Sequence, residues 1–280
     1  MRLATFTRRY IAERDVCREY AHALTNLAGD FSAWLRRQAD TRDFRDATVN
    51  RWLADLCSAN GRSKTTLANK RRQLLTLWRA AWMDGKVREP PKRVRVIETP
   101  PPQPTAWSKS DVKRLLAAAG REPGIMRCGV KRRDFWRAFV LVGYYSGLRL
   151  GDICRLRADQ INSSGMVLVR QHKTGAMVLC RLRRDALESL RRIASPKRER
   201  IIGGCLCRRR IMKQFRGVVA SAGLNGGTKM LRRTGATLVE LGTPGAAMAF
   251  LGHKTPGLAY RHYVDATAVQ RHKPTPPRIH

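Results

Sequence analysis

The sequence predicts a mainly α-helical protein with one small β-hairpin, divided into two domains by a proline-rich segment. Helical spacing of apolar residues runs through most of the 280 residues, strand-like alternation is confined to 166–182, and six prolines crowd into 90–106. Proline fixes φ and removes a backbone donor, so the segment 90–106 is expected to be an extended linker. The predicted domains are 1–89 and 107–265, followed by a C-terminal tail from 266 to 280.

Three helices are expected in the first domain. Apolar residues recur at three- and four-residue steps from Tyr20 to Leu35 and again from Val49 to Leu56. A third helix is expected to start near Ser63 and to end at Gly85, because glycine is a common C-terminal stop. This third helix carries a dense set of basic residues, namely Lys64, Lys70, Arg71, Arg72 and Arg79. Such a face predicts either contact with DNA phosphates or a solvated surface.

The second domain begins with a capping signal and contains the hairpin. Ser108 followed by Asp111 predicts a capping box at the start of a helix. The next predicted elements are a helix at 132–145, strands at 166–170 and 176–182 joined by a glycine-containing loop, and helices at 184–194, 209–222, 229–241 and 245–251. The tail after Asp265 is expected to be mobile, since it is rich in proline and basic residues.

The charge of the chain predicts a polyanionic partner. Lys and Arg number 56 against 21 Asp and Glu, which gives a formal net charge of +35. Nucleic acid is the expected partner, and an anionic membrane surface is the weaker alternative. No apolar stretch approaches the roughly 20 residues that span a bilayer, and the N-terminus lacks the apolar core of a signal peptide. A cytoplasmic protein is therefore expected.

Cysteine usage agrees with a reducing compartment. The seven cysteines are scattered, and none forms a Cys-x-x-Cys pair. A structural zinc site is not expected. Cys205 and Cys207 are interpreted as two small thiols in a loop or strand, with a metal or redox pair as the alternative.

Five separated features indicate phosphate chemistry. They are Arg149 between two glycines, Lys173 in the hairpin loop, Lys229 and Arg232 at i and i+3, His253 after Gly252, and the pair Tyr260 and Tyr263. An arginine next to glycines can present a bidentate guanidinium from a tight turn. Two cations on one helix face repel each other unless an anion lies between them. Taken singly, each feature is more often a surface or packing residue.

The order of these features resembles the tyrosine recombinase (phage-type integrase) family. The motifs are, in order, Gly-Leu-Arg-x-x-Asp-Ile, a hairpin lysine, Lys-x-Leu-Arg, Leu-Gly-His, and a tyrosine about ten residues later. The resemblance covers 107–265. The resemblance implies a C-shaped clamp around double-stranded DNA, made of a helical core-binding domain and a mostly helical catalytic domain. It also implies a tetramer on paired DNA sites, and a reaction that needs no cofactor, ATP or metal ion.

The resemblance assigns roles to five residues. Arg149 and Arg232 would be the two arginines that clamp the phosphate, and Lys173 would be the hairpin lysine that protonates the 5′-hydroxyl leaving group. Lys229 and His253 would occupy the positions filled by His or Lys and by His or Trp. Forked hydrogen bonds from two guanidiniums would offset the charge that develops on the non-bridging oxygens.

The nucleophile is expected to be Tyr263, with Tyr260 as the alternative. Many members of the family place this tyrosine nine residues after the histidine, but that position is His262 here. The ending Arg-His-Tyr-Val-Asp resembles a family variant in which the tyrosine attacks, and Tyr260 would lie one turn earlier. Arg233 also departs from the family pattern, which commonly has histidine after the second arginine.

The expected function is site-specific DNA recombination through a 3′-phosphotyrosyl intermediate, as in the integration of mobile elements. One alternative is strand relaxation like that of type IB topoisomerases, which uses the same chemistry on one duplex. Another is a DNA- or RNA-binding protein without activity, including a catalytically dead integrase. The chain is expected to begin at the core-binding region, without the arm-binding domain of long phage integrases.

Overall fold

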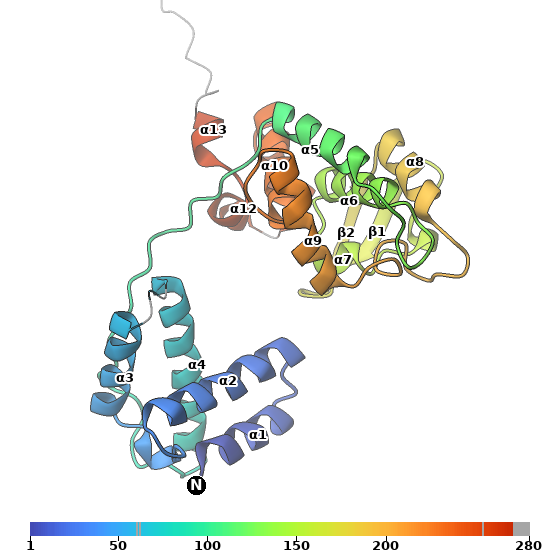
Figure 1. Ribbon diagram of the computed structural model, residues 1–280. Helices are drawn as coiled ribbons and strands as arrows, with labels where there is room; N and C mark the ends of the chain where they lie inside the picture. The colour runs from blue at the N-terminus through green and yellow to red at the C-terminus, as the bar shows by residue number, and fades with distance from the viewer. Residues whose placement is uncertain (60, 62, 254, 271–280) are drawn as a thin grey trace, which may run out of the picture. The chain divides into compact units, whose positions relative to one another are not determined.

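The computed structural model divides into two compact units and describes residues 1–59, 61, 63–253 and 255–270 (Figure 1). Unit 1 is Met1–Pro100 and unit 2 is Pro101–His280. Each unit has its own buried apolar core. The architecture is mainly helical with one two-stranded antiparallel sheet, as the sequence predicts.

Unit 1 is a helical unit packed around aromatic side chains. Phe31, Trp52 and Trp78 are almost completely buried, and the Phe31 and Trp52 rings meet edge to face with centroids 5.2 Å apart. The helices are α1 (Leu3–Glu13), α2 (Arg18–Trp34), α3 (Asp46–Ala59) and α4 (Lys64–Met83), with a 3₁₀ turn η1 at Thr41–Asp43. The three predicted helices are confirmed as α2, α3 and α4.

Helix α1 was not expected from the sequence. Only Leu3, Phe6 and Thr7 of its eleven residues are buried, so its apolar pattern is short. These side chains join the core formed by the other helices, and the Thr7 hydroxyl donates 2.8 Å to the Leu3 carbonyl. Packing against the rest of the unit, rather than a long amphipathic stripe, stabilises this helix.

The first part of the proline-rich segment packs onto unit 1. Val94 is buried there, and the Arg71 side chain donates hydrogen bonds to the carbonyls of Val94 at 3.0 Å and Arg95 at 2.6 Å. The Trp78 indole donates 2.8 Å to the Glu89 carbonyl. Residues 94–108 form no helix or strand, as expected for a linker with this many prolines.

Unit 2 begins with the predicted capping box, which the structure confirms. The Ser108 hydroxyl accepts from the Asp111 amide at 3.1 Å, and the Asp111 carboxylate accepts from the Ser108 amide at 2.9 Å. Helix α5 (Lys109–Arg121) follows. It packs on the buried helix α6 (Arg132–Ser146), whose Phe135 side chain is fully enclosed.

The predicted hairpin is also confirmed. Strands β1 (Met166–Arg170) and β2 (Met177–Arg181) pair antiparallel, with Leu168 opposite Leu179. Alternate side chains are buried on one face, because successive residues of a strand point to opposite sides. The connecting loop contains Lys173 and exposes it to solvent.

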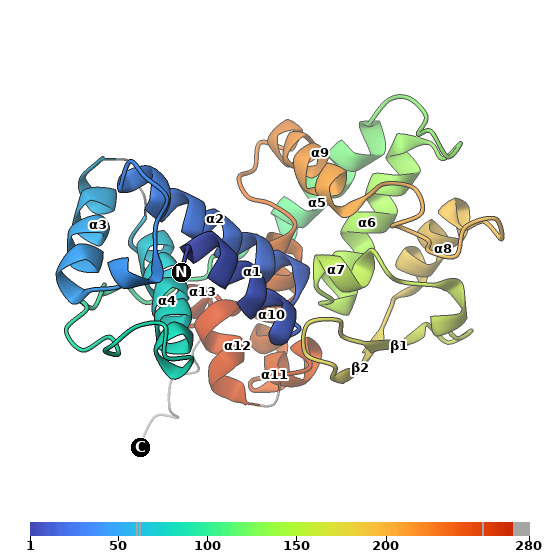
Figure 2. The ribbon, with the colours of Figure 1, turned by 90° about the horizontal axis from the view of Figure 1, so that it is seen from below.

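The remaining helices complete unit 2. They are α7 (Leu150–Ile153), η2 (Ala158–Gln160), α8 (Arg184–Ile193), α9 (Arg208–Ser221), α10 (Lys229–Gly242), α11 (Ala246–Leu251), α12 (Pro256–His262) and α13 (Ala266–Gln270). Helices α10, α11 and α12 gather at one side of the unit, around a small cluster that includes Ala236, Leu251 and Ala259 (Figure 2). This cluster brings distant parts of the sequence together.

The start of the C-terminal tail differs from the prediction. Residues 266–270 form helix α13, because the Asp265 carboxylate accepts from the Ala268 amide at 3.1 Å and Val269 packs against the α10–α12 cluster. The rest of the predicted mobile tail, 271–280, lies outside the described residues. No described helix has the length and apolar character needed to cross a membrane.

Candidate active site

Arg149 follows a tight turn at the end of α6. Gly147 ends this helix with φ +60°, and a Cβ atom there would lie 2.5 Å from the Phe250 ring. Glycine is therefore required both by the left-handed backbone and by the close ring. The turn places half-buried Arg149 at the cap of α7, where its guanidinium donates to the side-chain oxygen of Gln171.

Arg232 lies on α10 and is 3% exposed. Its guanidinium donates to the Gly147 carbonyl, and it donates 3.0 Å to the Leu251 carbonyl. Burial and the positive charge of Arg149 together lower its pKa to about 10, although Tyr263 acts in the opposite direction. A guanidinium held by carbonyls rather than by a carboxylate keeps its positive charge available to an anion. Its Nε atom has no hydrogen-bond partner among the described residues.

His253 stands beside Arg232. Its Nε2 atom lies 3.2 Å from an Arg232 guanidinium nitrogen, and burial together with the charges of Arg232 and Arg149 lowers its pKa to about 4. The ring is neutral at pH 7. The turn before it needs Gly252, whose φ is +62° and whose added Cβ would lie 2.4 Å from Val178.

Tyr263 lies among these cations. Its ring centroid is 4.7 Å from the Arg232 guanidinium carbon, 5.4 Å from the Lys229 ammonium and 5.2 Å from the His253 ring centroid. Burial alone would raise the pKa of the phenol. The positive charges of Arg232, Arg149 and Lys229 outweigh burial, and the net effect is a lowered pKa. A lowered phenol pKa favours the phenolate, which is the stronger nucleophile.

Tyr260 lies on the same segment but points elsewhere. Its hydroxyl donates to the Glu240 carboxylate, and this hydrogen bond, with burial and the negative charge, raises its pKa to about 12. The two tyrosines that the sequence left as alternatives therefore have opposite surroundings.

The two predicted lysines differ in their distance from the cluster. Lys229 is the first residue of α10. Its pKa is lowered mainly by partial burial and secondly by the positive charge of Arg233. Lys173 is exposed in the hairpin loop, and its positive charge contributes to the lowered pKa values of Lys229 and His262. Lys173 is thus near enough to act electrostatically, but no described contact fixes its ammonium group.

Gln171 is a member of the cluster that the sequence analysis missed. It is 1% exposed, and its side-chain oxygen accepts from Arg149 and, at 3.0 Å, from Thr174. Its amide nitrogen donates 3.4 Å to the Leu251 carbonyl, which also accepts from Arg232. A polar residue two positions before the hairpin lysine was the available signal.

Asp152 supports the same region, three residues after Arg149. It is 3% exposed, and its Oδ1 atom accepts from the His172 amide at 2.9 Å, which ties the hairpin loop to α7. Its other carboxylate oxygen has no hydrogen-bond partner in the described part of the chain. The negative charge raises the pKa of Arg232 and so partly offsets the effect of burial.

The basic residues of α4 fall into two groups. Lys70 forms an ion pair with Asp30, and Arg71 is bound to the backbone carbonyls of the proline-rich segment. Lys64, Arg72 and Arg79 are exposed. Three of the five predicted side chains are therefore exposed on unit 1, and the other two form contacts within it.

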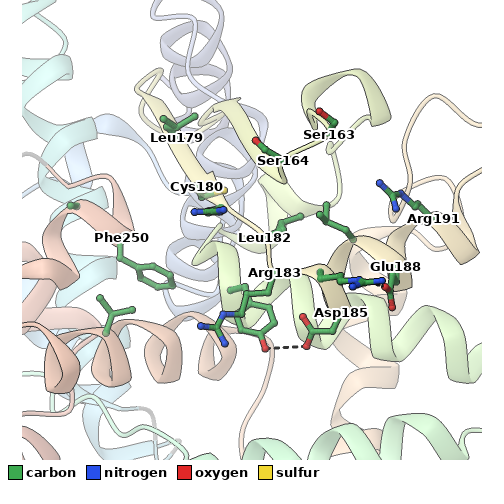
Figure 3. Close-up of a pocket in the computed structure, with 16 residues that line it drawn as sticks. Ser163, Ser164, Leu179, Cys180, Leu182, Arg183, Asp185, Glu188, Arg191 and Phe250 are labelled. Atoms are coloured by element: carbon green, nitrogen blue, oxygen red, sulfur yellow. Dashed lines mark hydrogen bonds and ion pairs between the residues drawn. The ribbon is translucent and has the colours of Figure 1, made fainter.

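A wide groove of unit 2 is separate from the arginine cluster. Its volume is about 1460 Å³, and it runs between β2, the start of α8 and the ends of α10 and α11 (Figure 3). Arg183, Asp185 and Phe250 line it, and Tyr145 donates 3.0 Å to Asp185 there. None of the predicted catalytic residues lines this groove.

The described residues contain no group of three or more His, Cys, Asp and Glu side chains placed to hold a metal ion. All seven cysteines are free thiols. Burial raises the pKa of Cys180 to about 12 and that of Cys154 to about 11, so both stay protonated at neutral pH.

Several solved structures that share this fold are integrases, at sequence identities below 20%. A crystal structure of a lambda integrase dimer bound to a COC′ core site is 19% identical, covers 100% of this chain and 99% of that chain, and has a TM-score of 0.72. The Tn1549 transposon integrase in complex with a circular intermediate DNA is 13% identical, covers 97% and 99%, and also has a TM-score of 0.72.

A lambda integrase tetramer bound to a Holliday junction is 19% identical, covers 100% of this chain and 80% of that chain, and has a TM-score of 0.70. No curated protein sequence matches the chain. The family comparison is more direct, since residues 107–269, more than half of the chain, match the phage integrase family. The chain therefore belongs to the phage integrase family.

Proposed function

We propose that this protein is a site-specific DNA recombinase that cuts and rejoins DNA strands through Tyr263. The proposal rests on the convergence of Arg149, Arg232 and His253 on one phenol. The Tyr263 ring centroid lies 4.7 Å from the Arg232 guanidinium carbon and 5.2 Å from the His253 ring centroid, and the charges of both arginines lower the pKa of the phenol. Family membership and the fold shared with DNA-bound integrases support the same reaction.

The proposed cleavage step begins at the Tyr263 oxygen. This oxygen attacks the phosphorus of a DNA phosphodiester, a bond forms between them, and the bond to the 5′ oxygen breaks. The DNA 3′ end is then held as a phosphotyrosyl ester, and the 5′ oxygen leaves as a hydroxyl after taking up a proton. Attack by a 5′-hydroxyl on this ester reverses the step and rejoins a strand.

The two arginines and His253 have different roles in this step. Arg149 and Arg232 donate forked hydrogen bonds to the two non-bridging oxygens, where negative charge grows in the transition state. His253 is neutral, and its Nε2 atom accepts from the Arg232 guanidinium, so its Nδ1–H, which has no hydrogen-bond partner among the described residues, is proposed to donate one further hydrogen bond to the same phosphate. The guanidinium pair is held by carbonyls and Gln171 before DNA arrives, which reduces the reorganisation needed during the reaction.

The two lysines are proposed to transfer protons. Lys173, on the exposed hairpin loop, is proposed to protonate the leaving 5′ oxygen. Lys229 has a lowered pKa and lies 5.4 Å from the Tyr263 ring centroid, so it is proposed to receive or relay the phenol proton. The nearby cations also favour loss of that proton, because they stabilise the phenolate.

Unit 1 is proposed to be the core-binding domain and unit 2 the catalytic domain. The exposed Lys64, Arg72 and Arg79 of α4 are proposed to contact DNA phosphates, and the net charge of +35 favours this. Assembly as a tetramer on paired sites is supported by the lambda integrase tetramer of similar fold. We place the reaction in the cytoplasm, where free thiols such as these are stable.

The test is the formation of a covalent protein–DNA adduct. Wild type, Tyr263→Phe and Tyr260→Phe are incubated with a pool of nicked duplexes that carry a randomised central segment, and SDS-resistant adducts are separated and sequenced. The proposal predicts an adduct for wild type and for Tyr260→Phe, and none for Tyr263→Phe. An adduct formed by Tyr263→Phe, or no adduct from wild type, would overturn it.

A further inference from the structure

The proposed nucleophile stands next to a helix with little apolar support. Among the described side chains of α12, only Ala259 is buried, and Tyr260 is 41% exposed. A helix of seven residues is too short to be stable alone in water, so its position depends on contacts with the rest of unit 2.

One end of this segment is bound to α10. The Thr237 hydroxyl accepts from the Asp265 amide at 2.9 Å, and the Arg233 side chain donates 3.3 Å to the His262 carbonyl. These contacts involve residues at or after the end of α12. The Thr237 hydroxyl also lies 3.5 Å from the Tyr263 carbonyl, and all three contacts reach the backbone of the segment rather than a side chain of α12.

Glu240 supplies a side-chain contact from the far end of α10. It is 2% exposed, and its carboxylate accepts from the backbone amides of Gly245 at 2.7 Å and Ala247 at 3.0 Å. The same carboxylate accepts from the Tyr260 hydroxyl. One buried group thus joins α10, the start of α11 and α12.

The carboxylate is ionised in this arrangement. Burial would raise the pKa of Glu240, but hydrogen bonds from Gly245, Tyr260 and Ala247 outweigh burial and lower the pKa. Hydrogen bonds to an ionised acceptor are about twice as strong as neutral ones. The contact can therefore hold a weakly packed helix.

We infer that Glu240 and Tyr260 form a tether that holds α12 in the rotation that presents Tyr263 to the arginines, which makes Tyr260 a positioning residue. Tyr260 lies three residues before Tyr263, which caps the C-terminal end of α12, so the direction of the Tyr263 side chain depends on how the helix is rotated. Fixing the first ring on Glu240 fixes the direction of the second. The inference rests on the proposed function for its consequence in the reaction.

The chain provides a matched control in Tyr145. Its hydroxyl donates 3.0 Å to the Asp185 carboxylate, the dashed line at Asp185 in Figure 3, and its pKa is also about 12. Burial is the main cause of that shift, followed by Asp185. Tyr145→Phe therefore removes the same kind of bond from unit 2 without touching α12.

The experiment measures two quantities for wild type, Tyr260→Phe and Tyr145→Phe. The first is amide hydrogen exchange of residues 256–264 in the protein without DNA. The second is the single-turnover rate of adduct formation, at saturating concentration, on a nicked duplex recovered from the wild-type adducts. The tether predicts faster exchange and a rate about tenfold lower for Tyr260→Phe alone, with DNA affinity unchanged.

Each result decides the inference. If Tyr260→Phe matches Tyr145→Phe in exchange and in rate, the tether is wrong. If exchange rises but the rate does not fall, Tyr260 supports the helix without positioning Tyr263, and the inference is overturned. If wild type forms no adduct, the proposed function fails, while the exchange comparison alone still supports or overturns the tether.

Discussion

Helices α4 and α10 both carry closely spaced basic residues, yet they use them differently. On α4, Lys70 is neutralised by Asp30, and Arg72 faces solvent. On α10, Arg232 is buried, is bound by carbonyl oxygens and lies beside Tyr263. A surface cation contributes affinity that salt screens, whereas a buried and fixed cation can stabilise a specific charge. Arg71 of α4 is also held by carbonyls, but it is only half-buried, so near-complete burial beside Tyr263 is what distinguishes Arg232.

The largest expected effect is at the buried cation. Arg232→Lys should slow adduct formation by about 10²–10³-fold, because one ammonium group cannot replace a fork that reaches two carbonyls and a phosphate. Single-turnover kinetics on the nicked duplex measure this. The matched control is Arg155→Lys, where an exposed guanidinium donates 2.9 Å to the Gly151 carbonyl. Equal rates for the two variants would contradict the distinction between buried and surface cations.

A smaller effect is expected from the pH dependence of stability. The pKa of His253 is about 4 in the folded protein and 6.5 in its ordinary state, so the unfolded chain binds this proton more readily. The stability that the neutral ring contributes is present above pH 6.5 and is lost as the pH falls toward 4.

From pH 7 to pH 5, wild type should lose about 1 kcal/mol more unfolding free energy than His253→Gln, since partial exposure of the ring to solvent screens part of the effect. Denaturant titrations at the two pH values measure the difference. If both proteins lose the same amount, His253 does not have the buried, cation-flanked environment described above.

The smallest effects are expected on α4. Arg72→Ala and Arg79→Ala should each reduce the slope of log affinity against log salt by about 0.9, since each removes one phosphate contact. Lys70→Ala should change the slope by less, because Lys70 is already paired with Asp30. Binding measured across a salt series separates these cases. A larger slope change for Lys70→Ala than for Arg72→Ala would contradict this and would show that Lys70, despite its ion pair with Asp30, contacts DNA.

Local signals in the sequence predicted most of the fold. The Ser108 capping box, the hairpin around Lys173 and helices α2, α3 and α4 were all predictable, because each depends on neighbouring residues. Helix α1 was missed because it buries few apolar side chains. Helix α13 was not predicted, because the chain after Asp265 is rich in proline and basic residues and was interpreted as a mobile tail.

The candidate site was predictable only in part. The order of motifs selected Arg149, Arg232 and His253, and the structure brings them together around Tyr263. The Arg-His-Tyr-Val-Asp ending favoured Tyr263 over Tyr260, but the contact of Tyr260 with Glu240 was not predictable, because Glu240 carries no motif. Gln171 was missed because its partners Arg149 and Leu251 are 22 and 80 residues away in the sequence.

We expect the phenol surrounded by cations, and not the one bound to a carboxylate, to become linked to DNA. Mass spectrometry of the wild-type adduct, after digestion of protein and DNA, locates the phosphodiester linkage on the peptide. We expect a nucleotide on Tyr263 and an unmodified Tyr260. A nucleotide on Tyr260, or on any side chain outside the arginine cluster, would contradict this expectation.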